Sequence, residues 1–335
     1  MKYLKLNFKH NQPIFIDWAI TTQCYLSCVH CRYQGLRYLN NELTTNETLE
    51  LATEINEQNP NWILIEGGEP FLRNDIFRII EILRTGSRPI YVISSGNGFN
   101  PVYAKRCQEL GGKLLISLDS AQKLTYEKIR HGASFEIVMR AIEISQAYQI
   151  LDSINFTLQE INAQTKEITA IGKLAKEMGI KSINFIGFKP NIAQRSYEII
   201  PNLLAVFSEI INIKEKYRIK VTVDEPFFIP WLKKSQVQIA SSYDENNGPI
   251  FFENRVGCIF GDYVFIEPDG TTKPCSFSAM SFQELGKNFL IEIQDKRNRK
   301  GKCAKCEYQM ECGGCRTRTY ALTKDWLESD PFCPL

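Results

Sequence analysis

Apolar runs alternate with amphipathic stretches along the first two-thirds of the chain. The short runs, rich in isoleucine, valine and leucine, have the length of buried strands, and the stretches between them repeat their apolar residues with a helical period. Strands separated by helices in this way predict parallel strands joined by right-handed crossovers. The six expected strands span residues 14–20, 61–65, 89–93, 113–118, 153–158 and 182–186. The helices expected between them span residues 44–57, 75–84, 101–110, 136–148 and 165–178.

The regular pattern weakens after the sixth strand. A further helix over 202–217 and a strand over 218–223 are followed by Pro226, Pro230 and the polar run 241–248. The aromatic residues around the two prolines either line a substrate mouth or form an ordinary packed linker. Six strand–helix units are also too few for a closed eight-unit barrel. We therefore expect an α/β domain over residues 1–225, a linker region over 226–254 and a cysteine-rich C-terminal domain over 255–335.

Composition and charge narrow the class of protein. The 335 residues are 44% apolar, which is enough for a substantial core, and the net charge of +2 gives no global field for nucleic acid. No apolar run reaches the length of a membrane span, and the first residues lack the apolar core of a signal peptide. We therefore expect a cytoplasmic protein that binds neither nucleic acid nor membrane.

The eleven cysteines fall into two groups, three near the start and seven from residue 258 onward, with Cys107 alone between them. A disulfide scaffold is unusual in a chain of this length without a secretion signal. The two groups therefore indicate metal sites, and because oxygen attacks such sites we expect an anaerobic or well-protected setting. Cys107 lies in the expected helix 101–110, where a buried and inert thiol is the preferred interpretation.

The first group, Cys24, Cys28 and Cys31, has the spacing Cys-x3-Cys-x2-Cys and follows the first expected strand. Three thiolates without a fourth at a matching distance suit a [4Fe–4S] cube with one open iron better than structural zinc, which takes four protein ligands. The alternative is three unrelated cysteines in a reduced protein. His30, inside the motif, is either an acid or ligand or a ring that packs over the site, and packing is the preferred interpretation.

This spacing resembles the signature of the radical S-adenosylmethionine (SAM) enzymes. A second resemblance to that family is the motif Gly67-Gly68-Glu69-Pro70, which directly follows the second expected strand. The resemblance implies a partial (β/α)6 parallel barrel, in agreement with the strand count. It also implies a [4Fe–4S] cluster whose open iron binds SAM and which yields a 5′-deoxyadenosyl radical.

The same resemblance implies which residues contact SAM. The backbone of the glycine motif and the Glu69 side chain would receive the methionine amino group, and Arg130 would pair with the methionine carboxylate. Turn chemistry or a solvated charge is the alternative for each single residue. The polar residues at the ends of the third and fourth strands, which would contact the ribose and the carboxylate, are Ser95, Asn97, Ser117 and Asp119.

The second group allows two interpretations. A zinc ribbon built on four of its cysteines would leave three others without a role. The set instead resembles the SPASM extension of radical SAM enzymes, which carries auxiliary [4Fe–4S] clusters, and Gly270, five residues before Cys275, fits that extension. The cysteines of the second group are Cys258, Cys275, Cys303, Cys306, Cys312, Cys315 and Cys333.

The position of each cysteine in the SPASM pattern implies a division between two clusters. One cluster would be complete, with the ligands Cys303, Cys306, Cys312 and Cys333. The cluster nearer the barrel would keep Cys258, Cys275 and Cys315, so that one iron binds substrate or takes a ligand such as a carboxylate. The gap Gly313-Gly314 is one residue shorter than the usual pattern. The basic run Lys296, Arg297, Arg299, Lys300 and Lys302 is interpreted as a solvated face, with docking of an acidic partner or substrate as the alternative.

The C-terminal sequence 312–333 resembles the subgroup of pyrroloquinoline quinone, mycofactocin and alternative haem enzymes. The leading hypothesis is hydrogen abstraction from a ribosomal peptide or protein, giving an oxidative modification or a cross-link. The alternatives are decarboxylation or trimming of tetrapyrrole side chains and, in a different class, an iron–sulfur electron-transfer protein. About 13 residues precede the first strand, too few for a leader-binding domain, so a peptide substrate would need a separate recognition protein. A flavodoxin or ferredoxin would supply electrons.

We do not expect a peptide epimerase that uses a dedicated thiol in the barrel. Such a reaction returns a hydrogen atom to the substrate radical, usually from a cysteine. Between Cys31 and Cys258 the chain has only Cys107, on an expected helix. A net oxidation, cross-link or carbon loss is the expected outcome.

The cysteine count predicts three [4Fe–4S] clusters in the anaerobically reconstituted protein. Iron and sulfide analysis should find about twelve of each per chain, since each cube holds four. Tight zinc at the second group together with only about four irons per chain would contradict this prediction.

Overall fold

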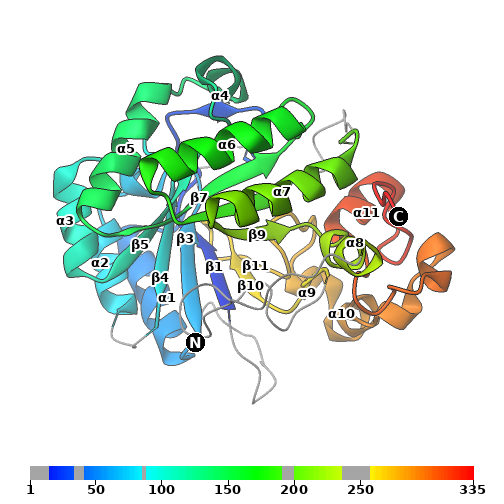
Figure 1. Ribbon diagram of the computed structural model, residues 1–335. Helices are drawn as coiled ribbons and strands as arrows, with labels where there is room; N and C mark the ends of the chain where they lie inside the picture. The colour runs from blue at the N-terminus through cyan, green and yellow to red at the C-terminus, as the bar shows by residue number, and fades with distance from the viewer. Residues whose placement is uncertain (1–14, 34–40, 85–87, 191–199, 236–256) are drawn as a thin grey trace.

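The computed structural model describes residues 15–33, 41–84, 88–190, 200–235 and 257–335 (Figure 1). The expected alternation of strands and helices is present, so the α/β class predicted from the sequence is confirmed. The strands of the main sheet are β1 (Phe15–Ala19), β3 (Trp62–Glu66), β4 (Ile90–Ser94), β5 (Gly112–Ser117), β7 (Leu151–Leu158), β8 (Ser182–Gly187), β9 (Lys220–Asp224), β10 (Val264–Ile266) and β11 (Thr272–Lys273).

The main sheet is largely parallel and open. Its nine strands have the order β11–β10–β1–β3–β4–β5–β7–β8–β9, and only β10 and β11 pair antiparallel. The outermost strands β11 and β9 are not paired with each other in the part of the chain that the structure describes. The architecture is therefore barrel-like without being a closed barrel, as the sequence predicted.

Alternation along the strands separates a helix-covered face from a hollow one. Ile63 and Ile65 of β3 pack in the large apolar core, whereas the alternate residues Leu64 and Glu66 face a cavity. Polar residues take such inward positions on other strands, among them Asn155 of β7. The inner face therefore carries polar side chains that can contact a ligand, and the outer face forms the hydrophobic core with the helices.

The six helices expected in the α/β part begin and end close to the predicted positions, and residues 123–129 form a further helix that the sequence analysis did not predict. Thr44 caps the first helix and forms a capping box with Glu47, as its sequence predicted. The described helices include none that is long and apolar enough to cross a membrane. The helices are α1 (Thr45–Glu57), α2 (Ile76–Leu83), α3 (Pro101–Glu109), α4 (Lys123–Ile129), α5 (Phe135–Ala147), α6 (Thr165–Met178), α7 (Leu203–Tyr217) and α8 (Phe228–Lys234).

The expected linker 226–254 contains helix α8, which the sequence analysis did not predict. Phe228 and Trp231 are buried and lie 5.1 and 5.5 Å, between ring centroids, from Phe207 of α7. These aromatic residues are therefore core packing, although Pro226 beside them does line the cavity. The polar run 241–248 lies outside the described residues.

The C-terminal region does not form an isolated unit. Strand β10 pairs parallel with β1, with Ile16 opposite Val264, and so extends the barrel sheet beyond its first strand. The expected boundary after residue 225 therefore does not separate two sheets. The remaining C-terminal elements lie to one side of the sheet (Figure 1), and are α9 (Phe282–Leu285), α10 (Lys287–Gln294) and α11 (Arg316–Thr323), with 3₁₀ turns at Lys296–Asn298 and Gly301–Lys305.

A buried arginine joins the C-terminal region to the end of β9. Arg318 of α11 donates to both oxygens of Glu225 at 2.8 and 3.0 Å, and to Asp330 at 2.7 Å. Its guanidinium also lies 5.0 and 5.1 Å from the ring centroids of Phe227 and Phe332. All three charged side chains are at most 4% exposed, so one cation compensates two carboxylates that have left water.

Replacing Arg318 with Ala should strongly destabilise the protein. The change leaves Glu225 and Asp330 buried without their cation, and breaking a buried pair costs about 3–5 kcal/mol. The measurement is the unfolding midpoint, with Arg297→Ala as the matched control because Arg297 is exposed and pairs only with Asp295. Equal midpoints in the two variants would contradict the role of Arg318 as the joint.

Candidate active site

A cavity of about 320 Å³ occupies the inner face of the sheet and reaches the carboxyl ends of its strands. Its volume lies within the range of small-molecule sites. The three cysteines of the first group line it together with Cys258, Cys275 and Cys315 of the second group. Residues more than 200 positions apart in the sequence are therefore brought to one chamber, and the three members of the second group are those assigned above to the cluster nearer the barrel.

The cysteine loop is fixed to the barrel at two places. Ser27–Cys28 (β2) pairs antiparallel with Arg130–His131 (β6). On the other side, the backbone N–H of Gly68 donates to the carbonyl of Thr21 at 2.7 Å, and that of Glu69 donates to Gln23 at 2.7 Å. The loop therefore has little freedom to move relative to the strand ends.

The two glycines of the motif allow these backbones to meet. A Cβ atom at Gly68 would overlap the carbonyl group of Gln23, and one at Gly67 would overlap the carbonyl oxygen of Thr21. Gly67 also has a φ of +139°, which side-chain-bearing residues rarely adopt. The two glycines therefore permit a close approach of backbone to backbone, and the partner is the cysteine loop.

Glu69 lies behind the cavity wall, where its side chain contacts Ser94 and Ser95. The carboxylate is fully buried and accepts from Ser94 Oγ at 2.9 Å, from Ser95 Oγ at 2.6 Å and from Ser95 N at 2.9 Å. It is not among the residues that line the cavity, and neither are Pro70 and Asn97. Gly67, Gly68 and Ser95 do line it, so the contribution of Glu69 is to hold the serine turn in place.

Asp119 and Arg130 form a buried ion pair beneath the cysteine loop. Arg130 Nε donates to Asp119 Oδ2 at 2.6 Å, and Nη1 lies 3.8 Å from Cys28 Sγ. The other Asp119 oxygen accepts from the Thr157 N–H at 2.7 Å. Burial opposes the charge of Arg130, but Asp119 and Cys28 raise its pKa overall, so it stays a cation. Arg130 and Ser117 line the cavity, whereas Asp119 lies behind it.

The structure favours the packing interpretation for His30 and the inert interpretation for Cys107. Burial lowers the pKa of His30 to about 4, so its ring is neutral near pH 7, and Nδ1 lies 3.1 Å from Gln159 Nε2. Cys107 is fully buried on α3, and burial raises the pKa of its thiol to about 12. Neither side chain is placed to exchange protons readily with a substrate.

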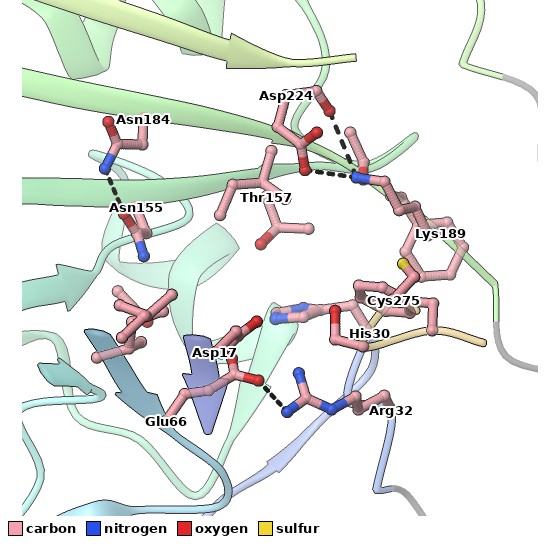
Figure 2. Close-up of a pocket in the computed structure, with 18 of the residues that line it drawn as sticks. Asp17, His30, Arg32, Glu66, Asn155, Thr157, Asn184, Lys189, Asp224 and Cys275 are labelled. Carbon is pink, nitrogen blue, oxygen red and sulfur yellow. Dashed lines mark hydrogen bonds and ion pairs between the residues drawn. The ribbon is translucent and has the colours of Figure 1, made fainter. Parts of the chain in front are cut away.

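Sequence reasoning missed a network of charged residues on one side of the cavity (Figure 2). Arg32, directly after the cysteine motif, pairs with Glu66 and stacks on the ring of Phe265 at 4.7 Å. Asp17 of β1 is 8% exposed, and its Oδ1 atom has no hydrogen-bond partner within the described residues. Burial and the neighbouring Glu66 raise the pKa of Asp17 well above its usual range. An acidic residue in the middle of an apolar strand was the available signal.

The opposite side of the cavity carries a cation and a ladder of amides. Lys189, after β8, donates to Asp224 Oδ2 at 2.6 Å and is only 8% exposed. Asn184 donates to Asn155 at 2.9 Å and accepts from Thr222 at 2.6 Å. Apolar side chains complete the chamber, and they include Phe15, Trp62, Leu64, Ile93 and Leu115.

The donor chemistry of the two cysteine groups fits iron–sulfur clusters. None of the eleven cysteines forms a disulfide, and the N–H of Leu26 donates to Cys24 Sγ at 3.4 Å. In the described part of the chain, no three His, Cys, Asp or Glu side chains are close enough to hold one metal ion. A tetrahedral zinc site brings its sulfurs to about 3.8 Å from one another, since each lies about 2.3 Å from the metal. In a [4Fe–4S] cube each thiolate binds a different iron, so the thiolates lie farther apart than in a zinc site.

Comparison with known families agrees with this site. The family model of the radical SAM superfamily matches residues 18–159, which include the cysteine loop, the glycine motif and Arg130. The matched region forms a radical SAM domain, and the protein is a radical SAM enzyme.

Curated relatives cover most of the chain. It is 28% identical to the AdoMet-dependent heme synthase of Methanosarcina barkeri, over 96% of this chain and 97% of the relative. It is also 28% identical to the Fe-coproporphyrin III synthase of the same organism, over 98% and 90% of the two chains. The mycofactocin maturase MftC of Mycobacterium ulcerans is 28% identical, but over only 41% of this chain and 38% of the relative.

Solved structures support the fold over nearly the whole chain. The structure of native anSMEcpe with bound AdoMet has a TM-score of 0.67 at 19% identity and covers 96% of this chain and 94% of its own. Streptococcus suis SuiB bound to S-adenosylmethionine has a TM-score of 0.72 at 14% identity, with coverage of 96% and 77%. At this identity the likeness concerns the fold alone.

Replacing Gly68 with Ala should weaken SAM binding and lower the unfolding midpoint. The added methyl group overlaps the Gln23 carbonyl, and relieving such overpacking costs about 1–3 kcal/mol and moves the cysteine loop. Gly112→Ala in β5 is the control, because its Cβ would lie 3.6 Å from the nearest atom, an ordinary contact. Unchanged SAM affinity and an unchanged midpoint in Gly68→Ala would show that the two backbones can separate freely.

Proposed function

We propose that this radical SAM enzyme carries a SPASM-type set of auxiliary clusters and oxidises a carboxylate-bearing side chain of a tetrapyrrole. The observation that carries the proposal is the shared chamber, since thiols of both cysteine groups line one cavity. A substrate there can lie near the SAM site and near the second cysteine group at once. An electron-transfer protein would have no need of such a chamber.

The first group, Cys24, Cys28 and Cys31, would hold a [4Fe–4S] cluster. When bound, that cluster supplies the electron that splits SAM into methionine and the 5′-deoxyadenosyl radical. Gly67, Gly68, Ser95, Ser117 and Arg130 would form the walls of the SAM site, because their atoms line the cavity beside the loop. Glu69, Pro70, Asn97 and Asp119 would support that site from behind, with Glu69 orienting Ser95 and Asp119 orienting Arg130.

The second group would hold two auxiliary clusters in residues 255–335. Cys258, Cys275 and Cys315 would serve the cluster that borders the chamber, and Cys303, Cys306, Cys312 and Cys333 the more distant one. Burial raises the pKa of Cys312 and Cys315 to about 12, and the bond from the Gly314 N–H to Cys312 Sγ at 3.4 Å acts in the opposite direction and supports a thiolate there. Backbone donors of this kind stabilise thiolate charge.

The substrate class rests on the relatives with the largest coverage. Those matched over at least 90% of their own length, introduced above, are named for heme or Fe-coproporphyrin synthesis. The chamber suits such a substrate, since Phe15, Trp62 and Leu115 offer an apolar wall and Lys189 and Arg32 offer cations for carboxylates. The leading hypothesis from the sequence was a peptide, and we now rank it second.

The net reaction is balanced without a further oxidant. Conversion of one propionate side chain to a vinyl group removes one hydrogen atom and one molecule of CO₂ and releases one electron. The hydrogen atom goes to the 5′-deoxyadenosyl radical, and one electron is consumed when SAM is cleaved. SAM and the propionate therefore yield 5′-deoxyadenosine, methionine, CO₂ and the vinyl product.

A peptide substrate remains the second candidate because of the partial match to MftC and the amide ladder Asn155–Asn184–Thr222, which suits backbone hydrogen bonds. The expected peptide product is an oxidised or cross-linked chain. A peptide of unchanged mass apart from one solvent deuterium at an inverted α-carbon would instead indicate epimerisation, which the lack of a cavity-lining thiol outside the two cysteine groups disfavours.

The deciding experiment is an anaerobic assay of the reconstituted enzyme with SAM and a chemical reductant. Iron coproporphyrin III should stimulate 5′-deoxyadenosine formation and lose CO₂ and two hydrogens per propionate, as measured by mass spectrometry. The variant in which Cys24, Cys28 and Cys31 are all Ala should produce neither product. Stimulation by a precursor peptide and not by the porphyrin would overturn the tetrapyrrole proposal and support the second candidate.

Replacing Asp17 with Asn should stabilise the protein near neutral pH and weaken substrate binding. A buried carboxyl with a raised pKa binds more protons in the folded than in the unfolded state, so wild-type stability falls as pH rises from the unfolded pKa of about 3.9 toward the raised value. The amide has no such titration. The variant also lacks the carboxyl oxygen that faces the chamber, and this loss should raise the substrate KM.

The measurements are unfolding midpoints between pH 4 and pH 8 and the KM for the porphyrin. Asp152→Asn is the control, since Asp152 of β7 also has a pKa raised by burial but does not line the cavity. A midpoint for Asp17→Asn that follows the same pH slope as the wild type would contradict the prediction, as would an unchanged KM.

A further inference from the structure

A second, smaller cavity lies beside Cys258, which also lines the chamber. Its volume is about 130 Å³, and three cations line it: Lys296, Arg299 and Arg316. Asp262 is the only carboxylate among the residues that line it, and it is already the acceptor of a bond from Gln294 at 3.4 Å. The positive charges at this cavity therefore outnumber the negative ones.

Both arginines have a donor without a partner. Arg299 is 4% exposed and Arg316 is 1% exposed, yet Arg299 Nη1 and Arg316 Nη2 have no hydrogen-bond acceptor within the described residues. A buried guanidinium with an unsatisfied N–H is costly. Burial and the charge of Arg316 lower the pKa of Arg299 to about 10, which reflects the same lack of compensation. An anion in this cavity would compensate the positive charges and accept hydrogen bonds from the two unpartnered N–H groups.

The double glycine holds the two guanidiniums in position. Arg299 Nε donates to the carbonyl of Gly313 at 3.1 Å, and Arg316 Nε donates to the carbonyl of Gly314 at 3.3 Å. Both glycines have positive φ, +71° and +62°, and a Cβ at Gly314 would lie 2.7 Å from Arg316 Nη2. The gap that departs from the usual SPASM spacing is thus the part of the chain that presents these arginines.

The cations act on thiols from both parts of the second cysteine group. Arg299 interacts electrostatically with Cys258 and Cys303, and Lys296 interacts with Cys258 and Cys312. Lys296 also donates to the carbonyls of Met310 and Glu311 at 2.9 and 3.1 Å. Arg299 and Lys296 therefore act both on a cysteine assigned to the chamber cluster and on cysteines assigned to the distant cluster.

We propose that Arg299, Arg316 and Lys296 form an anion seat for the auxiliary cluster that Cys258 ligates, and that they raise its reduction potential. The inference rests on the proposed function, because it requires an auxiliary cluster at Cys258. Arg299 Nη1 and Arg316 Nη2 supply hydrogen bonds to the sulfur atoms of that cluster. A reduced cluster carries one more negative charge than an oxidised one, so fixed cations and N–H donors favour reduction.

The functional consequence is that the cluster at Cys258 accepts the electron before the distant cluster does. The cluster that borders the chamber gains one negative charge when it accepts the electron released by substrate oxidation. Three cations beside Cys258, two of them buried, make that uptake more favourable and reduce its repulsion from the distant cluster. Arg299 and Lys296 thus act electrostatically on this cluster, whereas the sequence analysis interpreted the basic run as a solvated face.

The test is a redox titration of the reconstituted auxiliary clusters, followed by electron paramagnetic resonance. The background is the variant with Ala at Cys24, Cys28 and Cys31, so that only clusters of the second group contribute. Arg299→Gln removes the charge and should shift the potential of one auxiliary cluster to more negative values. Arg299→Lys keeps the charge and should shift it less. Arg297→Gln is the control, since Arg297 is two residues away, exposed and paired with Asp295.

Each outcome decides the proposal. Equal potentials in Arg299→Gln and Arg297→Gln would overturn it. Loss of auxiliary iron in Arg299→Gln that Arg299→Lys restores would support it, because charge is then what the cluster requires. Equal loss in both Arg299 variants would overturn it, because the side chain then acts only as a structural support. Absence of iron from the second group in the background protein itself would count against the proposed function instead.

Discussion

The structure depends on the contact between two backbones, those of the cysteine loop and of the glycine motif. Gly68 and Glu69 donate to the carbonyls of Thr21 and Gln23 at 2.7 Å, and no side chain fits between the two segments. This contact places three thiols at the mouth of the barrel and keeps them there. Because backbone hydrogen bonds at this distance leave no free space, the position of the loop is decided by the absence of a Cβ atom rather than by any favourable side chain.

Around that contact, buried charges are arranged in pairs that support the site from outside it. Asp119 orients Arg130 next to Cys28, and Glu69 holds Ser95. Both carboxylates lie behind the cavity wall, so they act on the cavity-lining Arg130 and Ser95 without touching the chamber. The charged network of Asp17, Glu66 and Arg32 has the opposite arrangement, since it faces the chamber and leaves a carboxyl oxygen uncommitted. The carboxylates of Asp119 and Glu69 are hydrogen-bonded, whereas Asp17, which faces the cavity, has a carboxyl oxygen without a hydrogen-bond partner in the described residues.

The C-terminal region is bound to the barrel by two kinds of interaction. Strand β10 extends the sheet through backbone hydrogen bonds, and Arg318 bridges Glu225 and Asp330 in a fully buried position. Together they bring Cys258, Cys275 and Cys315 to the chamber. The same region contains buried cations with unpartnered donors, which a folded protein tolerates at a site that an anionic group occupies. The buried arginines of this region therefore form two separate sets, Arg318 with its two carboxylates and Arg299 and Arg316 with unpartnered donors.

The sequence by itself determined the parallel strands and their helices, because apolar periodicity is a local property of each segment. It also determined the class of the enzyme, since Cys24, Cys28, Cys31 and the glycine motif lie in short stretches with fixed spacing. Only the tertiary structure decided that β10 joins β1, that Glu69 and Asp119 lie behind the cavity, and that Asp17 and Lys189 face it. These features depend on contacts between residues far apart in the chain. No local pattern encodes them, because each depends on a residue or strand that comes into contact only when the whole chain folds.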